Sequence, residues 1–258
     1  MTPPNGAHSF AIIVPQSYYR EACLIQRSNA HIPERISHRA AHDSLPENTI
    51  PAFLKALALG ADAIELDVHA TSDGVGVVHH DPTVAWRRNK SQTTAAIADL
   101  TSVELRKVVL SGDARIPTLA DVLNAVGDGP RVYVEIKGER IEPLVVRCIR
   151  ESSANCAVHS FDHRIARTVK EIFPAIRTGV LEVARHLDPL AALVETGAED
   201  LWQDRTLIDE DLVTRVHSAN CKVIAWTSND PAEWKRLRAI GVDGICTDRI
   251  GELAAFAW

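Results

Sequence analysis

The sequence lacks any apolar stretch close to the ~20 residues that a membrane-spanning helix requires. Its one short apolar patch near the N-terminus, Phe10 to Val14, has no basic residue before it, which is unlike a secretory signal. The five cysteines are scattered, odd in number and never spaced as C-x-x-C. This pattern is typical of reduced thiols rather than a disulfide framework. We therefore expect a cytoplasmic protein without stable membrane insertion.

The sequence also has no excess of positive charge, since its formal net charge is −6 at pH 7. A mildly acidic chain argues against nucleic acid as the main partner. It does not exclude an anionic small molecule, because a local basic pocket can override the net charge. The 258 residues, 46% of them hydrophobic, suit one large domain. Nothing in the sequence indicates the oligomeric state.

Residues 1–34 differ from the rest of the chain because they show no sustained hydrophobic period and hold several prolines, Pro3, Pro4, Pro15 and Pro33. We expect them to form an N-terminal extension that is partly disordered. Residues 35–258 are then a single domain.

From Arg35 onward, short apolar runs alternate with amphipathic stretches, which is typical of βα units. The predicted strands are 35–39, 63–69, 75–80, 131–137, 156–161, 177–181, 200–203, 222–227 and 244–247. Only five residues separate the second and third of these runs, whereas parallel strands need a crossover of a dozen or more. This pair must therefore be antiparallel, and Asp73-Gly74 is a strong signal for a two-residue hairpin turn.

Without the return strand of that hairpin, eight strands remain. They predict an α/β fold of the (β/α)₈ TIM-barrel type with a local β-hairpin after the second strand. A doubly wound open sheet is the structural alternative. However, no G-x-G-x-x-G follows the first strand to support a dinucleotide site.

Two acidic residues, Glu65 and Asp67, stand two apart in an otherwise apolar strand, so both point to one face. Two buried carboxylates repel each other and lose hydration, which is costly without a cation. Oxygen ligands suit Mg²⁺ or Ca²⁺. An acidic face that meets solvent or surface arginines is the alternative.

If Asp73 and Gly74 are the two central turn residues, Asp67 falls opposite His80, give or take one register step. An imidazole there could act as a general acid or base. The neighbouring His79 would face away.

Two further strand ends carry polar residues suited to a phosphate. Glu135 and Lys137 share a face, and they could supply a third metal ligand and a phosphate-binding cation; a simple ion pair is the alternative. The first strand ends in Ser37-His38-Arg39. Barrel active sites lie at the C-terminal ends of strands, and an arginine fork matches phosphate oxygens.

The segment HRAAHDSLPENTIPAFLKALALGADAIELDVHATSDGVGVVHHDPT closely resembles the defining N-terminal half of the glycerophosphodiester phosphodiesterase family. The strings IPTLADVL, VEIK, HSFD, AWTSND and GVDGICTD then follow in that family's order. The likeness covers about residues 35 to 250, and the ordered combination is far more specific than any single string. It implies a TIM barrel that hydrolyses glycerophosphodiesters to sn-glycerol 3-phosphate and an alcohol.

The resemblance also implies a role for individual residues. It implies that one divalent cation, Mg²⁺ or Ca²⁺, is held by Glu65, Asp67 and Glu135. It implies acid–base catalysis by His38 and His80. Substrate binding falls to Arg39, Lys137, Trp226 and Phe161. Ala40 departs from the family, which usually has glycine there, and would strain the loop if the position needs a positive φ. Residues 83–94 also depart from the usual pattern.

Two other functions stay open at this point. One is a lysophospholipase D-type phosphodiesterase that acts on lysolipids, and the other is an inactive barrel used as a binding module. The sequence leaves the alcohol, the metal and the nucleophile undecided. The nucleophile is either water or the adjacent glycerol hydroxyl, which would give a cyclic phosphate.

Overall fold

The computed structural model describes residues 31–40, 45–88, 91–110 and 113–258. Ile32–Trp258 form one compact unit. Most of the predicted extension, residues 1–30, lies outside the described residues, so its separation from the domain at residue 34 stays a prediction.

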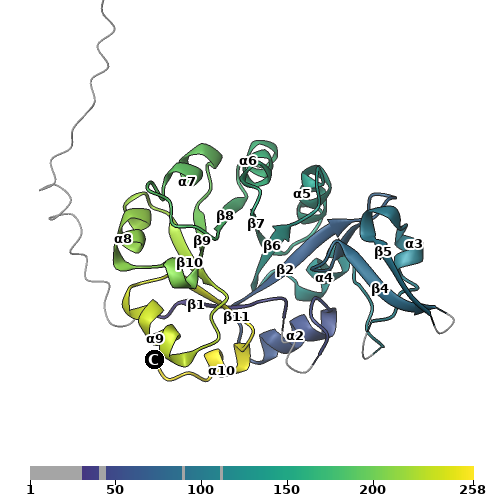
Figure 1. Cartoon of the computed structure of the whole chain (residues 1–258), viewed down its shortest axis with the longest axis horizontal. Helices are drawn as coiled ribbons and strands as arrows, with labels where there is room; N and C mark the ends of the chain where they lie inside the picture. The colour runs from purple at the N-terminus through teal and green to yellow at the C-terminus, as the bar shows by residue number, and fades with distance from the viewer. Residues whose placement is uncertain (1–30, 41–44, 89–90, 111–112) are drawn as a thin grey trace, which may run out of the picture. The chain divides into compact units, whose positions relative to one another are not determined.

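Eight parallel strands form the frame of this unit and alternate with helices (Figure 1). The strands are β1 (Glu34–Ser37), β2 (Ala63–Ala70), β6 (Arg131–Ile136), β7 (Asn155–Ser160), β8 (Arg177–Glu182), β9 (Asp200–Asp204), β10 (Lys222–Trp226) and β11 (Gly244–Thr247). Each strand pairs with its neighbour in this order, and β1 pairs with both β2 and β11. The ring is therefore closed, which confirms the predicted barrel and excludes the open sheet.

Helices cover the outside of the ring, as Figure 1 shows for α5 to α8. They are α2 (Ile50–Ala58), α4 (Leu119–Val126), α5 (Glu142–Arg150), α6 (His163–Ile172), α7 (Ala191–Thr196), α8 (Glu210–Ser218), α9 (Pro231–Ala239) and α10 (Ile250–Ala254), with the short 3₁₀ turn η3 (Arg205–Leu207). Alternation along the strands separates two packing surfaces. On β8, for example, Val180 packs outward among the helices and Leu181 packs inside the barrel.

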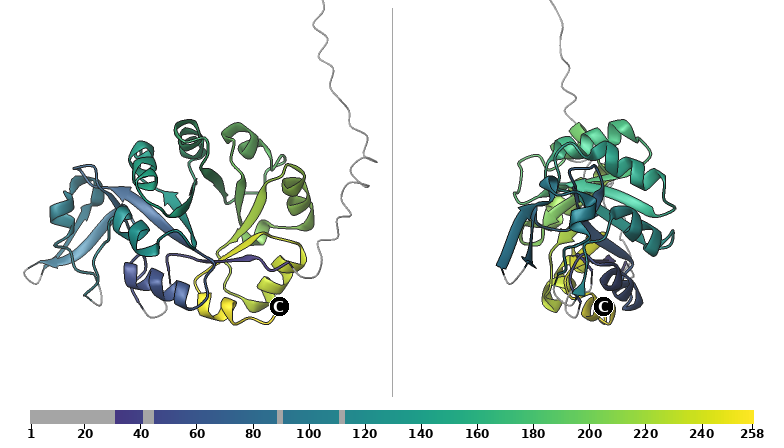
Figure 2. Two further views of the ribbon diagram at one scale, coloured as in Figure 1. Left: turned by 180° about the vertical axis from the view of Figure 1, so that it is seen from behind. Right: turned by 90° about the vertical axis from the view of Figure 1, so that its right-hand side faces the viewer.

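A small excursion follows β2. It contains β3 (Gly76–Val78), β4 (Thr83–Arg88), β5 (Ser91–Ala96), η1 (Ile97–Asp99) and α3 (Ser102–Leu105). The β4–β5 hairpin was not predicted from the sequence. It lies on the same side of the barrel as α3 and away from α8 (Figures 1 and 2). Val84 and Ile97 pack there with Leu105 and Val77 in a cluster of their own.

The β2–β3 hairpin is present, but its predicted register is wrong by one residue. Val68 pairs with Val78 and Ala70 with Gly76. The backbone N–H of Thr71 donates to the Val75 carbonyl at 3.0 Å, so the loop holds three residues, 72–74. Gly74 adopts a φ of 74°, the left-handed conformation that closes three-residue hairpin loops. Asp73 stabilises this loop because its carboxylate accepts a hydrogen bond of 2.8 Å from the backbone N–H of Ser102.

Trp202 is fully buried inside the barrel, and Gly179 on the next strand leaves room for it. A methyl group at Gly179 would lie 3.0 Å from the Trp202 ring and 3.2 Å from Cβ of Asp200. We expect Gly179→Ala to destabilise the domain by about 1–3 kcal/mol through overpacking, measured as a lower urea midpoint. Gly129→Ala is the control, because a methyl there meets no atom within 4 Å. Equal midpoints for the two variants would contradict this account of the packing.

Candidate active site

Three carboxylates gather where β2 and β6 end. The register pairs Asp67 directly with Glu135, and Glu65 lies two residues before Asp67 on the same face. All three are buried, with exposed fractions of 0% for Asp67, 2% for Glu65 and 8% for Glu135. Neighbouring strands therefore bring the predicted acidic residues together inside the barrel instead of leaving them at the surface.

Two cations and an amide contact these carboxylates. Lys137 Nζ lies 2.9 Å from Glu135 Oε1 and 3.4 Å from Asp67 Oδ1. Arg39 Nε lies 3.3 Å from Asp67 Oδ2, which also accepts a 2.9 Å hydrogen bond from the Asn48 side chain. The backbone N–H of Arg39 donates to Glu65 Oε2 at 3.2 Å. Both predicted phosphate-binding cations thus lie against the cluster.

Positive φ angles shape the loop after β1 that supplies Arg39. Arg39, Ala40 and Asn48 have φ values of 51°, 82° and 56°. Ala40 is fully buried, so a methyl group sits in a conformation that favours glycine. The expected strain at Ala40 is therefore present, although its methyl packs in the core.

Burial makes the cluster electrostatically unfavourable without a further cation. Burial, with the charge of Asp67 adding to it, raises the pKa of Glu65 to about 7. Burial and the charge of Glu65 likewise raise the pKa of Glu135 to about 7. Burial also opposes ionisation of Asp67, but the charges of Lys137 and Arg39 hold its pKa below the ordinary value. Two cations thus offset only part of the repulsion among three carboxylates.

A buried imidazole that was not predicted completes the cluster. His159 on β7 pairs in register with Glu135 and is 1% exposed. One ligand atom each from Glu65, Glu135 and His159 lie within 4.8 Å of one another. In the described part of the chain, this is the single such group of three metal-binding residue types. Burial lowers the pKa of His159 to about 4, so the ring is neutral at physiological pH.

The predicted histidine of the first strand is oriented by a carboxylate. His38 Nδ1 lies 2.6 Å from Asp248 Oδ1, just beyond the end of β11. Asp248 is itself held by Asn229, whose amide donates to Asp248 Oδ2 at 2.6 Å. A carboxylate at one ring nitrogen fixes the tautomer and directs proton transfer to the other nitrogen.

The second predicted histidine lies near the cluster for a different reason than expected. Asp67 faces His79 and not His80 across the hairpin, because the backbone N–H of His79 donates to the Asp67 carbonyl at 3.0 Å. His80 follows the end of β3, where strand alternation no longer applies. Its charge nevertheless contributes to the low pKa of Asp67. Its Nδ1 lies 2.8 Å from Asp81 Oδ1, an arrangement that parallels His38 and Asp248.

Two aromatic residues lie at the ends of β7 and β10. The rings of Phe161 and Trp226 meet edge to face with centroids 5.3 Å apart. Lys137 Nζ lies 6.0 Å from the centroid of Phe161, so this pair adjoins the charged cluster. Phe161 is 45% exposed, which leaves its ring available to a ligand.

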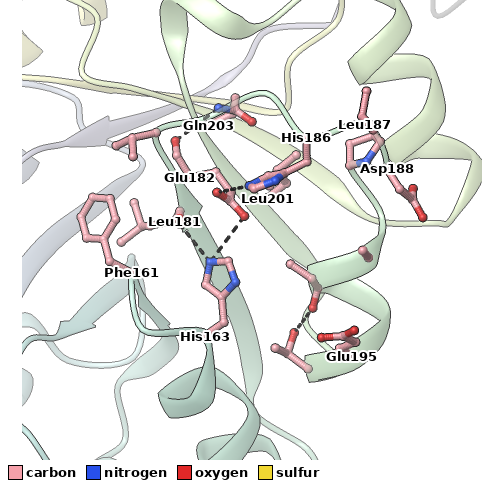
Figure 3. A pocket seen from close by; sticks show the side chains of 15 residues that line it. Phe161, His163, Leu181, Glu182, His186, Leu187, Asp188, Glu195, Leu201 and Gln203 are labelled. Atoms are coloured by element: carbon pink, nitrogen blue, oxygen red, sulfur yellow. Dashed lines mark hydrogen bonds and ion pairs between the residues drawn. The ribbon is translucent and has the colours of Figure 1, made fainter.

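Phe161 is also one wall of a pocket of about 670 Å³ (Figure 3). The buried carboxylate of Glu182 lies between two imidazoles there, 2.8 Å from His186 Nε2 and 3.6 Å from His163 Nε2. The other lining side chains are mostly apolar and come from β8, β9, α7 and the segment between β8 and α7. The cluster carboxylates do not line this pocket, so it lies beside the site rather than within it.

Comparison with known proteins decides the assignment. Residues 38–252 match the model of the glycerophosphoryl diester phosphodiesterase family. The chain belongs to this family. The predicted family and enzyme class, a phosphoric diester hydrolase, are thereby confirmed.

Individual relatives agree with the family match. The chain is 34% identical over 228 residues to a glycerophosphodiester phosphodiesterase of Caldanaerobacter subterraneus subsp. tengcongensis, covering 83% of this chain and 93% of that protein. A solved glycerophosphodiester phosphodiesterase of Parabacteroides distasonis has a TM-score of 0.76 at 25% identity, covering 86% and 95% of the two chains. A phosphodiesterase of Oleispira antarctica has the same fold, with a TM-score of 0.78 at 21% identity over 87% and 96%; its structure contains the product sn-glycerol-3-phosphate.

Sequence reasoning did not predict the contacts that four residues make with the cluster or its histidines: Asn48, Asp81, His159 and Asp248. Three lie in strings that carry the family likeness, HDP, HSFD and CTD, and Asn48 lies in PENT. The strand pattern offered a signal for His159 as well, because it is the one polar residue between Cys156 and Ser160. The carboxylate partners of the histidines had no periodic signal, since both lie in loops.

None of the helices in the described ranges has the length and apolar character needed to cross a bilayer.

Proposed function

We propose that the chain hydrolyses glycerophosphodiesters to sn-glycerol 3-phosphate and an alcohol at the C-terminal end of the barrel. The observation that carries the proposal is the convergence of Glu65, Asp67 and Glu135 with Arg39 and Lys137, near two histidines that are each oriented by an aspartate. The product bound in the Oleispira antarctica phosphodiesterase supports the same reaction.

Glu65, Asp67 and Glu135 would hold a divalent cation. The residues fit such an ion, because burial and the charge of a neighbouring carboxylate raise the pKa of both Glu65 and Glu135. Asp67 Oδ1 is also buried without a hydrogen-bond partner, with Lys137 Nζ 3.4 Å away, which is costly unless something else satisfies it. A bound cation would stabilise negative charge that develops on the phosphate oxygens. Carboxylate ligands point to Mg²⁺ or Ca²⁺.

His38 and His80 would share the proton transfers. One ring takes a proton from the attacking oxygen, and the other donates a proton to the leaving alcohol oxygen. Asp248 and Asp81 orient the rings through Nδ1, so proton transfer is assigned to Nε2. The attacking oxygen belongs either to water or to the adjacent glycerol hydroxyl, which would give a cyclic phosphate that water then opens.

Arg39 and Lys137 would bind the other phosphate oxygens, which requires that they exchange part of their contact with Asp67 for the substrate. Phe161 and Trp226 would pack against the carbon atoms of the diester. The pocket beyond Phe161 offers space for the alcohol portion. A cytoplasmic location stays a prediction that rests on the sequence alone.

A diester panel tests the proposal. We expect sn-glycerol 3-phosphate release from soluble glycerophosphodiesters, loss of release with chelator, and recovery when Mg²⁺, Ca²⁺ or Mn²⁺ is added back. Release of choline from lysophosphatidylcholine but not from glycerophosphocholine would contradict the proposal in favour of a lysolipid substrate. Release that is insensitive to chelator would contradict the role of the carboxylates.

A further inference from the structure

His159 takes no part in the proposed proton transfers, which are assigned to His38 and His80. Its ring lies inside the barrel between β6 and β8 and is 1% exposed. It is stacked on Trp202, with ring centroids 4.3 Å apart and an interplanar angle of 21°. Packing therefore fixes the ring plane next to Glu65 and Glu135.

The spacing between His159 and Glu65 is that of two metal ligands rather than of a hydrogen bond. His159 Nε2 lies 3.8 Å from Glu65 Oε1, whereas an N–H···O hydrogen bond spans about 2.7–3.2 Å. Two donors that each lie about 2.0–2.2 Å from one ion can be up to about 4.4 Å apart. Glu135 offers a third donor within the same 4.8 Å group.

His159 Nε2, the ring nitrogen nearest to Glu65, makes no hydrogen bond among the described residues, although the residue is only 1% exposed. A buried polar atom without a partner is rare and unfavourable. Asp67 differs, because Asn48 and Arg39 contact its Oδ2 and Lys137 Nζ lies 3.4 Å from its Oδ1. Among the donors facing the cluster, the imidazole is thus the one whose contacts are most incomplete.

We infer that His159 is a direct ligand of the cation, together with Glu65 and Glu135. This inference rests on the cation site of the proposed function and revises its ion. An imidazole nitrogen suits first-row transition ions such as Mn²⁺, Co²⁺ and Zn²⁺, whereas Ca²⁺ is bound by oxygen. The site therefore favours a transition ion over Ca²⁺, although it contains the carboxylates that predicted a harder ion.

Calorimetric titration of the full-length chain, stripped with chelator, tests the inference through binding alone. We expect His159→Gln to weaken Zn²⁺ binding by at least ~10–100-fold, the loss seen when even an indirect partner of a metal ligand is removed. Ca²⁺ binding should change much less. His217→Gln is the matched control, since His217 pairs with Asp243 at the opposite end of the strands and should change neither affinity.

A crystal of the wild-type protein soaked in Zn²⁺ keeps the test decisive even if His159→Gln does not fold. We expect an anomalous-scattering peak within about 2.2 Å of a His159 ring nitrogen. A peak on Asp67 and Glu135 that leaves the imidazole more than about 3 Å away would overturn the inference and leave the proposed function intact. Failure of every cation to bind would instead overturn the cation site itself.

Discussion

Replacement of either His38 or His80 by alanine is expected to reduce kcat by ~10²–10⁴-fold, the usual contribution of a general acid or base. The two rings act on opposite ends of one displacement, so the double variant should lose little more than the worse single variant. Because both side chains lie at loop positions that are 21% and 32% exposed, the melting temperature should stay close to that of the wild type. Steady-state release of sn-glycerol 3-phosphate measures the effect.

His217→Ala is the control for histidine loss as such. His217 Nε2 lies 2.7 Å from Asp243 Oδ2, whose carboxylate also accepts from the backbone N–H of Val223 where β10 begins. This contact is at the end of the barrel opposite the site. The variant should therefore melt earlier yet keep its kcat. Retention of more than about a tenth of wild-type kcat by His38→Ala or His80→Ala would remove that residue from the proposed mechanism.

The frame of the site was predictable because strand alternation is a strong local pattern. Each predicted barrel strand appears within two residues of its observed bounds. The pairing of Asp67 with Glu135 follows from the parallel register that a closed barrel imposes. The apolar runs and their two-residue alternation therefore predicted that the three carboxylates lie close together.

What could not be predicted depends on contacts between distant loops. The hairpin loop holds three residues, not two, because Thr71 bonds to both Asp73 and Val75 and Ser102 binds Asp73 from α3. That shift puts His79 rather than His80 opposite Asp67. In the short β4–β5 hairpin only β4 has an apolar face, formed by Val84 and Trp86. Its partner β5 (Ser91–Ala96) reads SQTTAA, so alternation could not reveal the pair.

Replacement of Glu135 by glutamine is expected to abolish cation binding and to lower kcat by ~10²-fold or more, since a carboxylate ligand is lost. In the cation-free protein, by contrast, the same substitution should relieve a loss of folding stability that occurs as the pH rises. Burial and the charge of Glu65 raise the pKa of Glu135 from 4.5 to about 7. The folded state therefore binds more protons than the unfolded chain between about pH 4.5 and pH 7. By linkage, stability must fall as the pH rises through this window.

Glu65 contributes to the same fall, because its pKa is raised over the same range. Each pKa unit corresponds to about 1.4 kcal/mol, so the two glutamates should lower the unfolding free energy of the cation-free wild type by a few kcal/mol between pH 4.5 and pH 8. The lowered pKa of His159 acts in the opposite direction below about pH 6.5, so the comparison between variants isolates the glutamates. Glu135→Gln removes one of the two raised groups and the repulsion between them. The unfolding free energy of the variant should therefore fall roughly half as much over this pH range, or less. The lost contact between residue 135 and Lys137 opposes this stabilisation.

Urea unfolding at pH 5 and pH 8, with chelator and with saturating cation, measures both effects. Without cation, the fall in unfolding free energy from pH 5 to pH 8 should be smaller in Glu135→Gln than in the wild type. With saturating cation, the wild type should be the more stable of the two proteins, because it alone gains binding free energy. A cation-free wild type whose unfolding free energy falls no more between pH 5 and pH 8 than that of Glu135→Gln would show that the carboxylates do not repel one another. The reason given for a cation at this end of the barrel would then be lost.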